Sequence, residues 1–189
     1  KRAQDGDKGL NTGGMGTIAP NPYYTDEIAA ECMETIFKPT IEAMKAEGRT
    51  FTGCLYFGLM LTPKGPKVIE YNCRFGDPET QVVLPLLESD LMEIMEKIYE
   101  GKLAEAEVKF ADKSACCVVM ASSGYPQSYE KGFEITMPAD KNIYVAGAAL
   151  KDGKLVNSGG RVLGVTETAE NLEAAITKAY ETVKTVNFA

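Results

Sequence analysis

The chain has 189 residues, of which 44% are hydrophobic and 25% are charged, a composition typical of a soluble globular protein with one large or two small domains. A net charge of −7 argues against a nucleic-acid-binding protein that works through a general basic surface. The absence of histidine excludes imidazole acid–base chemistry and histidine-ligated zinc. No apolar run approaches the ~20 residues of a membrane span, and five cysteines without a CxxC pair favour a reducing cytoplasm.

Residues 1–22 contain five glycines, and this density predicts a loop without helix or strand. A helical pattern begins at Thr25, which can cap it, and Gly48 ends it. Pro39 should split or kink this helix, because proline removes a backbone donor and clashes with the preceding turn. The chain begins inside the glycine-rich loop and lacks an initial methionine, so we expect a fragment of a longer protein.

Residues 51–61 and 66–74 have the composition of strands and flank the turn sequence TPKGP, which predicts a hairpin. A helix should follow, capped by Ser89, continuing to Tyr99 and ending at Gly101.

From Val108 the chain is rich in strand-forming segments, and Asp152-Gly153 between two of them is a strong hairpin signal. Residues 169–186 have a helical apolar face. We therefore predict two domains: a mixed lobe over residues 1–108 and a small β-rich domain with a terminal helix over residues 109–189.

Residues 68–80, VIEYNCRFGDPET, place Glu70, Asn72 and Arg74 at alternate positions of the second predicted strand, and therefore on one face. Glu70 and Asn72 offer oxygen ligands about 7 Å apart along the backbone, and Mg²⁺ prefers a few such oxygens completed by phosphates and water. Arg74 would then bind the phosphates that the metal holds. A solvated polar face of an antiparallel strand would give the same alternation.

Asp77 and Glu79 add two carboxylates directly beyond this row, in a sequence that a tight turn also explains. A pocket for a small amine or an amino acid would use such groups. The opening sequence DGDKGLNTGGMG is a second candidate, because glycine-rich loops let backbone N–H groups approach phosphates or carboxylates. It matches neither common nucleotide-binding glycine pattern, and an ordinary flexible loop remains the alternative.

Four segments together resemble the phosphoribosylamine–glycine ligase family, also called glycinamide ribonucleotide synthetases. They are DGDKGLNTGGMG, KVIEYNCRFGDPETQ, VVMASSGYP and GGRVLGVT, and they extend over most of the chain in order. The resemblance implies an α+β fold: the C-terminal lobe of an ATP-grasp domain, an antiparallel sheet with helices, followed by a small β-rich domain with a C-terminal helix.

The resemblance also implies roles for individual residues. Glu70 and Asn72 match ligands of Mg²⁺ or Mn²⁺, while Arg74 and Asp77 match positions at the reacting groups. The substrate-binding positions that it implies are Asp7, Asn11, Thr12, Gly13, Gly14 and Glu79.

The implied reaction joins glycine to 5-phosphoribosylamine at the expense of ATP and gives glycinamide ribonucleotide, ADP and phosphate through a glycyl phosphate, a step of de novo purine biosynthesis. The implied partners are these small molecules alone, without nucleic acid, membrane or an obligate protein partner. We expect these 189 residues to be inactive alone. Another ATP-grasp carboxylate–amine ligase and a non-catalytic folded module are the alternatives.

Overall fold

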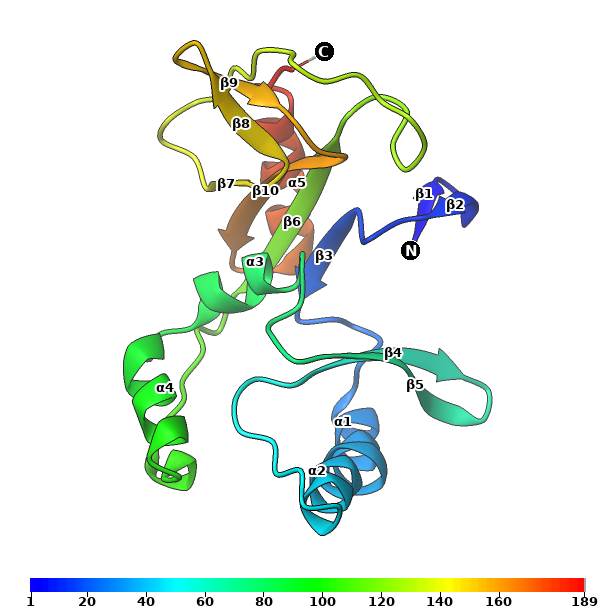
Figure 1. Ribbon diagram of the computed structural model, residues 1–189, viewed down its shortest axis with the longest axis vertical. Helices are drawn as coiled ribbons and strands as arrows, with labels where there is room; N and C mark the ends of the chain where they lie inside the picture. The colour runs from blue at the N-terminus through cyan, green and yellow to red at the C-terminus, as the bar shows by residue number, and fades with distance from the viewer. Residues whose placement is uncertain (189) are drawn as a thin grey trace. The chain divides into compact units, whose positions relative to one another are not determined.

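The computed structural model describes residues 1–188, which divide into two compact units (Figure 1). The sheet unit comprises residues 1–19, 77–86 and the chain from residue 111 onward, and the hairpin unit comprises residues 20–76 and 87–110. The predicted boundary near residue 108 would separate residues 16–19 from the C-terminal half. These residues instead pair with a strand of that half. A division into domains at that residue stays a prediction.

An antiparallel sheet of four strands, in the order β3-β6-β10-β7, forms the centre of the sheet unit. Its strands are β3 (Gly16–Ala19), β6 (Ser114–Ala121), β10 (Arg161–Ala169) and β7 (Ile143–Val145). The central pair β6 and β10 is the most buried, as expected for strands covered on both faces. Residues 133–137, within the part of the chain rich in strand-forming residues, form only isolated bridges, at Glu134 and Thr136.

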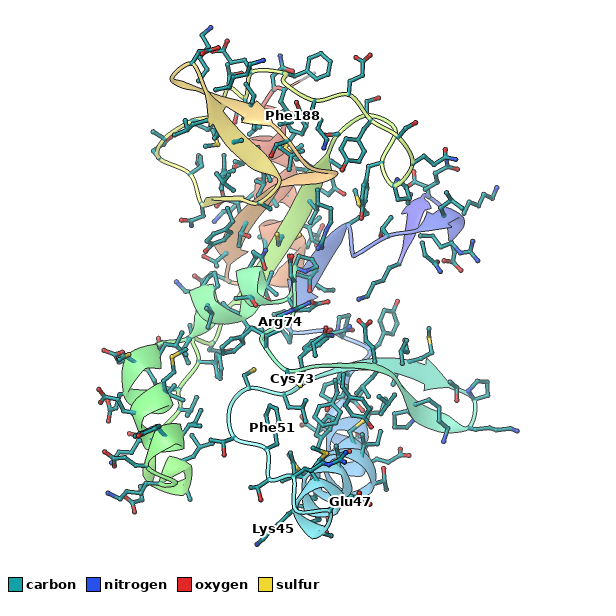
Figure 2. All side chains as sticks on the ribbon, viewed as in Figure 1. Lys45, Glu47, Phe51, Cys73, Arg74 and Phe188 are labelled. Carbon is teal, nitrogen blue, oxygen red and sulfur yellow. The ribbon has the colours of Figure 1, made fainter. Side chains whose placement is uncertain are left out.

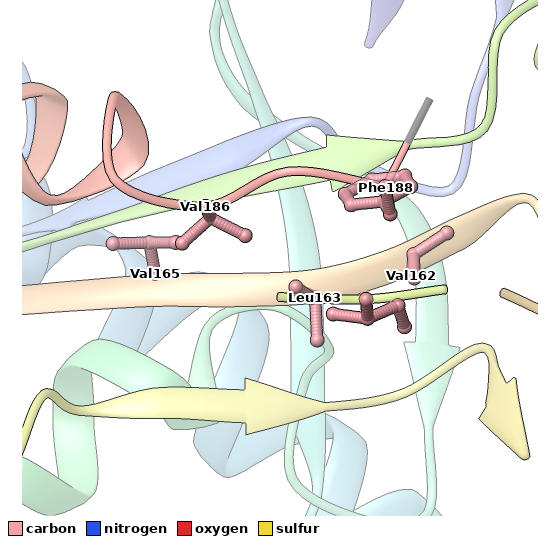
Figure 3. Packing of buried hydrophobic residues seen from close by; sticks show 6 residues of the cluster. Val162, Leu163, Val165, Val186 and Phe188 are labelled. Carbon is pink, nitrogen blue, oxygen red and sulfur yellow. The ribbon is translucent and has the colours of Figure 1, made fainter. Parts of the chain in front are cut away.

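Helices cover both faces of this sheet. On one face, α5 (Leu172–Val183) packs its small residues Ala175 and Ala179 against Cys116 of β6. On the other face, α3 (Thr80–Val83) and the 3₁₀ turn η2 (Leu84–Leu86) pack Val82 and Leu86 against Cys117. A third cluster joins β10 to the C-terminal segment, where Val162, Leu163 and Val165 lie close to Val186 and Phe188 (Figure 3).

Two small hairpins complete the sheet unit. The first pairs β1 (Arg2–Gln4) with β2 (Lys8–Asn11), so the prediction of a loop without strands over residues 1–22 was wrong. Its turn contains Gly6 and Asp7 at φ values of 70° and 57°, which explains why a glycine-rich sequence closes a hairpin here. The second pairs β8 (Ala148–Lys151) with β9 (Lys154–Asn157), and the Asp152-Gly153 turn between them confirms the prediction.

The hairpin unit begins with a helical segment made of α1 (Asp26–Cys32), the π-helical turn η1 (Met33–Phe37) and α2 (Lys38–Ala46). Thr25 caps it, as predicted, by accepting a hydrogen bond from the Ile28 amide at 3.4 Å. The widened π turn directly precedes Pro39, where proline cannot donate to the preceding turn. The hairpin of β4 (Tyr56–Thr62) and β5 (Gly65–Asn72) follows, with shorter strands than predicted.

The hairpin unit ends with α4 (Leu91–Tyr99) and the 3₁₀ turn η3 (Leu103–Glu105). The predicted cap of α4 was wrong by one residue: Asp90, not Ser89, accepts a hydrogen bond from the Met92 amide at 2.8 Å. The Ser89 hydroxyl instead bonds the backbone of Glu107 and Lys109. None of the helices in residues 1–188 has the length and apolarity that a membrane span requires.

Candidate functional site

The face of β5 that carries Glu70 and Asn72 is set by its pairing with β4. Tyr56 pairs with Asn72 and Gly58 with Glu70, so these four residues share one face. The register shifts between Gly58 and Leu59, which leaves Ile69 as an extra residue on β5. This bulge keeps Glu70 and Asn72 together while Val68 and Tyr71 take the opposite face.

Gly58 makes room for the Glu70 side chain. A Cβ atom at position 58 would lie 2.8 Å from Glu70 Cγ, so any larger residue would force the Glu70 side chain or the strand to shift. Glu70 is exposed and Asn72 half-buried. A carboxylate and an amide oxygen on one face suit a hard divalent cation such as Mg²⁺ that takes its other ligands from phosphates and water. In the described part of the chain no group of three or more acidic or cysteine side chains forms a closed metal cage.

Arg74 departs from the predicted row, because β5 ends at Asn72 and Arg74 lies in the bend that follows (Figure 2). The assignment of Arg74 to the strand was wrong. Its guanidinium donates to the Phe75 carbonyl at 2.7 Å, which holds the side chain against its own backbone, and the side chain remains exposed.

The opposite face of β5 borders an apolar groove of about 750 Å³ within the hairpin unit. Val68, Tyr71 and Cys73 line one side of it, and side chains of α2 and of the following loop line the other; Phe51 and Glu47 are labelled in Figure 2. Phe57 packs between Phe37 and Tyr71 on this face, with a tilted ring contact at 4.5 Å between centroids and an edge-to-face contact at 5.3 Å. The hairpin therefore has an apolar face toward the helices and a polar face with the candidate ligands.

The second candidate cluster lies in the sheet unit, around the loop that connects β2 with β3. The Thr12 hydroxyl donates to the Lys1 carbonyl at 2.7 Å and accepts from the Gly14 amide at 3.1 Å. The loop enters β3 at Gly16, where a Cβ atom would lie 2.8 Å from the Cys117 carbonyl oxygen. The sheet therefore fixes one end of the loop and the Thr12 side chain fixes the other.

Asp77 joins this loop through Arg161, the first residue of β10. The Arg161 guanidinium lies 3.0 Å from the Asp77 carboxylate and also donates to the carbonyls of Gly13, Gly14 and Asp77. Sequence reasoning did not select Arg161, although it stands in the segment GGRVLGVT used for the resemblance. A charged residue directly after two glycines was the available signal.

The structure brings Thr12, Gly13, Gly14 and Asp77 together around Arg161. Asp7 lies in the turn of the first hairpin and Asn11 ends β2, both exposed. Glu79 precedes α3 and is half-buried. Glu70, Asn72 and Arg74 belong to the hairpin unit, so the predicted site residues form two clusters, one in each unit.

Two of the cysteines, Cys116 and Cys117, are buried in the sheet. All five are free, and burial raises the pKa of the Cys116 and Cys117 thiols. Buried thiols of this kind behave as small apolar side chains.

Two family models match the chain. Residues 1–80 match the model described as phosphoribosylglycinamide synthetase, ATP-grasp (A) domain, and residues 115–189 match the model described as phosphoribosylglycinamide synthetase, C domain. Together they leave only residues 81–114 unmatched.

The chain is also similar to curated proteins and to a solved structure. A phosphoribosylamine–glycine ligase of Caldanaerobacter subterraneus subsp. tengcongensis is 48% identical over the whole chain, which covers 46% of that protein. A bifunctional purine biosynthetic protein of Schizosaccharomyces pombe is 52% identical over the whole chain, which covers 24% of it. The crystal structure of phosphoribosylamine–glycine ligase from Thermotoga maritima superposes with a TM-score of 0.88 at 42% identity, over all of this chain and 47% of the other. The chain thus spans about half the length of the single-function relatives that it matches.

Proposed function

We propose, because the chain belongs to the phosphoribosylglycinamide synthetase family, that the protein carrying these residues ligates glycine to 5-phosphoribosylamine with ATP. The observation that carries this proposal is the match of both family models, in order, to one chain that is about half identical to named ligases along its whole length. The chain covers only part of these relatives, so the activity is proposed for the full-length protein.

The chemistry needs no protein nucleophile, which suits a chain without histidine. The glycine carboxylate attacks the γ-phosphorus of ATP and gives glycyl phosphate and ADP. The amine nitrogen of phosphoribosylamine then attacks the acyl carbon, loses a proton and expels phosphate. Positioning of the reactants and neutralisation of the transferring phosphoryl group supply most of the catalysis in such reactions.

Glu70 and Asn72 would hold a divalent cation, for which we propose Mg²⁺ or Mn²⁺. When bound, the cation would neutralise phosphate charge and orient the phosphates. The shared face of the two side chains and the space above Gly58 support this assignment. Arg74 would bind a phosphate oxygen after leaving the Phe75 carbonyl, because a guanidinium gains more from a doubly charged anion than from one neutral carbonyl.

The proposal extends to the loop of Thr12, Gly13 and Gly14, to Asp7 and Asn11 of the first hairpin, and to Glu79, as binding positions for glycine or phosphoribosylamine. We also place the protein in the cytoplasm, which fits five free cysteines.

A full-length ligase with these 189 residues tests the proposal. Formation of glycinamide ribonucleotide should require ATP, glycine, phosphoribosylamine and a divalent cation together, and omission of any one should abolish it. Other carboxylates and amines supplied in place of the two substrates test the alternative of a different ATP-grasp ligase. Turnover of another pair, without turnover of glycine and phosphoribosylamine, would replace the proposal by that alternative.

A further inference from the structure

Arg161 makes several polar contacts in the sheet unit. Its side chain is 23% exposed and its guanidinium donates to three carbonyls, those of Gly13, Gly14 and Asp77, at 3.1, 3.4 and 3.2 Å. It also pairs with the Asp77 carboxylate at 3.0 Å. The three carbonyls all accept from Nη1 and the carboxylate pairs with Nη2, so one guanidinium serves both sets of acceptors through two nitrogens, whereas a lysine ammonium places its three donors on one nitrogen.

Tyr125 holds the other side of the same loop. Its hydroxyl accepts a hydrogen bond from the Gly13 amide at 3.1 Å, so this residue is bound at its N–H by Tyr125 and at its carbonyl by Arg161. The Tyr125 ring lies directly over Gly160, where a Cβ atom would come within 2.2 Å of the ring. Gly160 therefore lets Tyr125 lie beside Arg161.

A buried polar network fixes the segments that carry these two residues. Asn157 is 1% exposed and donates to the Ser122 hydroxyl at 2.8 Å and to the Glu130 carbonyl at 2.9 Å. Ser122 in turn donates to the Gly159 carbonyl at 2.8 Å. Satisfied buried networks of this kind rigidify their surroundings. The segments that carry Tyr125 and Arg161 are therefore held in place where these side chains contact the loop.

The glycines of the loop approach their neighbours closely. A Cβ atom at Gly13 would lie 3.0 Å from the Arg161 guanidinium carbon. Gly14 has a φ of 114°, and a Cβ there would lie 2.9 Å from the ring of Pro78, which is fully buried. The two glycines thus fit closely between Arg161 and the turn at Asp77.

We propose that Arg161 and Tyr125 are positioning residues that hold the Thr12–Gly14 loop and Asp77 in the geometry that the ligase substrates require, an inference that rests on the proposed function. Asp77 acts here as the ion-pair partner of Arg161: one carboxylate oxygen pairs with the guanidinium and the other accepts from the Gln81 amide at 3.2 Å. The sequence predicted Asp77 as catalytic. In this proposal Asp77 instead helps Arg161 to hold the loop in position.

The first experiment measures amide hydrogen exchange by NMR in the 189-residue chain. Tyr125→Phe should release the Gly13 amide, which loses its acceptor. Arg161→Met should raise exchange at both Gly13 and Gly14 by about tenfold, although Arg161 bonds neither amide, while β6 and β10 keep their protection. Lys154→Met is the matched control, because it removes another surface ion pair, with Glu134 at 2.7 Å, and should leave the loop unchanged.

Unchanged loop exchange in Arg161→Met, or a uniform loss of protection through the sheet, would overturn the proposal. Should Arg161→Met fail to fold, Asp77→Asn and Tyr125→Phe decide in its place, because each removes one of the same contacts. These measurements need no ligase activity. A full-length protein that makes no glycinamide ribonucleotide would contradict the proposed function, but it would not change the result of the exchange experiment.

The second experiment measures steady-state kinetics of full-length variants. Arg161→Met should raise KM for glycine or phosphoribosylamine and lower kcat/KM on the order of 10²-fold, as misplaced binding groups do. Arg161→Lys should not restore it, because a single ammonium nitrogen cannot take the place of both Nη1, which donates to the carbonyls, and Nη2, which pairs with the carboxylate. Arg161 would merely support the fold if Arg161→Met left KM unchanged and lowered kcat only in proportion to the folded fraction. Full recovery of kcat/KM in Arg161→Lys would lead to the same conclusion.

Discussion

The Glu70 carboxylate lies on the polar face of β5 above a glycine, so its loss should affect a bound cation before it affects the fold. Glu70→Ala in the full-length protein should lower kcat on the order of 10²-fold, the usual effect of losing one preorganised electrostatic contact. Melting temperature without metal should change little, because the side chain is exposed. The measurement is kcat across a Mg²⁺ titration.

Glu42→Ala is the matched control for this experiment, since it removes an exposed acid of α2. It should leave both kcat and the melting temperature near their original values. If Glu70→Ala behaved in the same way at ordinary Mg²⁺ concentrations, the row of Glu70 and Asn72 would be a solvated strand face.

The buried Cys117 thiol should make the free energy of unfolding depend on pH. Burial raises its pKa above the ordinary value of 9.0, so the folded state holds this proton more tightly than the unfolded chain does. The stabilisation is fully present below the unfolded value and is lost as the pH rises through the folded pKa. Urea unfolding between about pH 7.5 and about pH 10 should therefore show a steeper loss of stability in the original chain than in Cys117→Ala. Val119→Ala is the control, because it changes a buried residue of the same strand without removing a titratable group, and it should retain the original pH dependence.

The sequence predicts single site residues only by their type and spacing. For this reason Glu70 and Asn72 were predicted and Arg161 was not. Alternation along a strand is a local property, and the bulge at Ile69 left it intact for these two residues. The contacts of Arg161 join residues separated by as many as 148 positions, and no local pattern reports such a contact. Asp77 was selected as an acid, but its partner depends on the same distant contact.

At the scale of elements, α5 offers a direct test of its cap. Asn171 accepts a hydrogen bond from the Ala174 amide at 2.9 Å, and this bond satisfies a donor of the first turn. Asn171→Ala should lower the free energy of unfolding by about 1 kcal/mol. Lys178→Ala, an exposed change within the same helix, should alter it little. Equal unfolding free energies for the two variants would show that the cap contributes nothing.

The element types followed largely from the sequence, and the comparisons confirm the predicted fold class, an α+β arrangement containing part of an ATP-grasp fold. The Asp152-Gly153 hairpin and the Thr25 cap were predictable because the turn and the cap each depend on adjacent residues. The strands of residues 1–19 were missed because glycine density was interpreted as loop. Glycine at Gly6 closes a turn, and glycine at Gly16 permits close approach to β6, so tertiary context decided both.

At the scale of the whole molecule, the 189-residue chain alone should not produce glycinamide ribonucleotide. It spans 46% of a ligase to which it is 48% identical, and the proposed activity belongs to the full-length protein. The purified chain, assayed for ADP and product beside a full-length ligase at equal concentration, should give no signal above background. Sustained turnover by the 189-residue chain would contradict this expectation.

The pairing of β3 with β6 also has a consequence during synthesis on the ribosome. Gly16 pairs with Val118, so β3 leaves the ribosome roughly 100 residues before its partner, or ~5–20 s earlier at ordinary rates of translation. During that interval the sheet of this unit cannot close, and one edge of a nascent strand stays open to other chains. Slowing translation between these two segments should therefore lower the soluble yield, whereas slowing it after residue 169, when β10 is complete, should not.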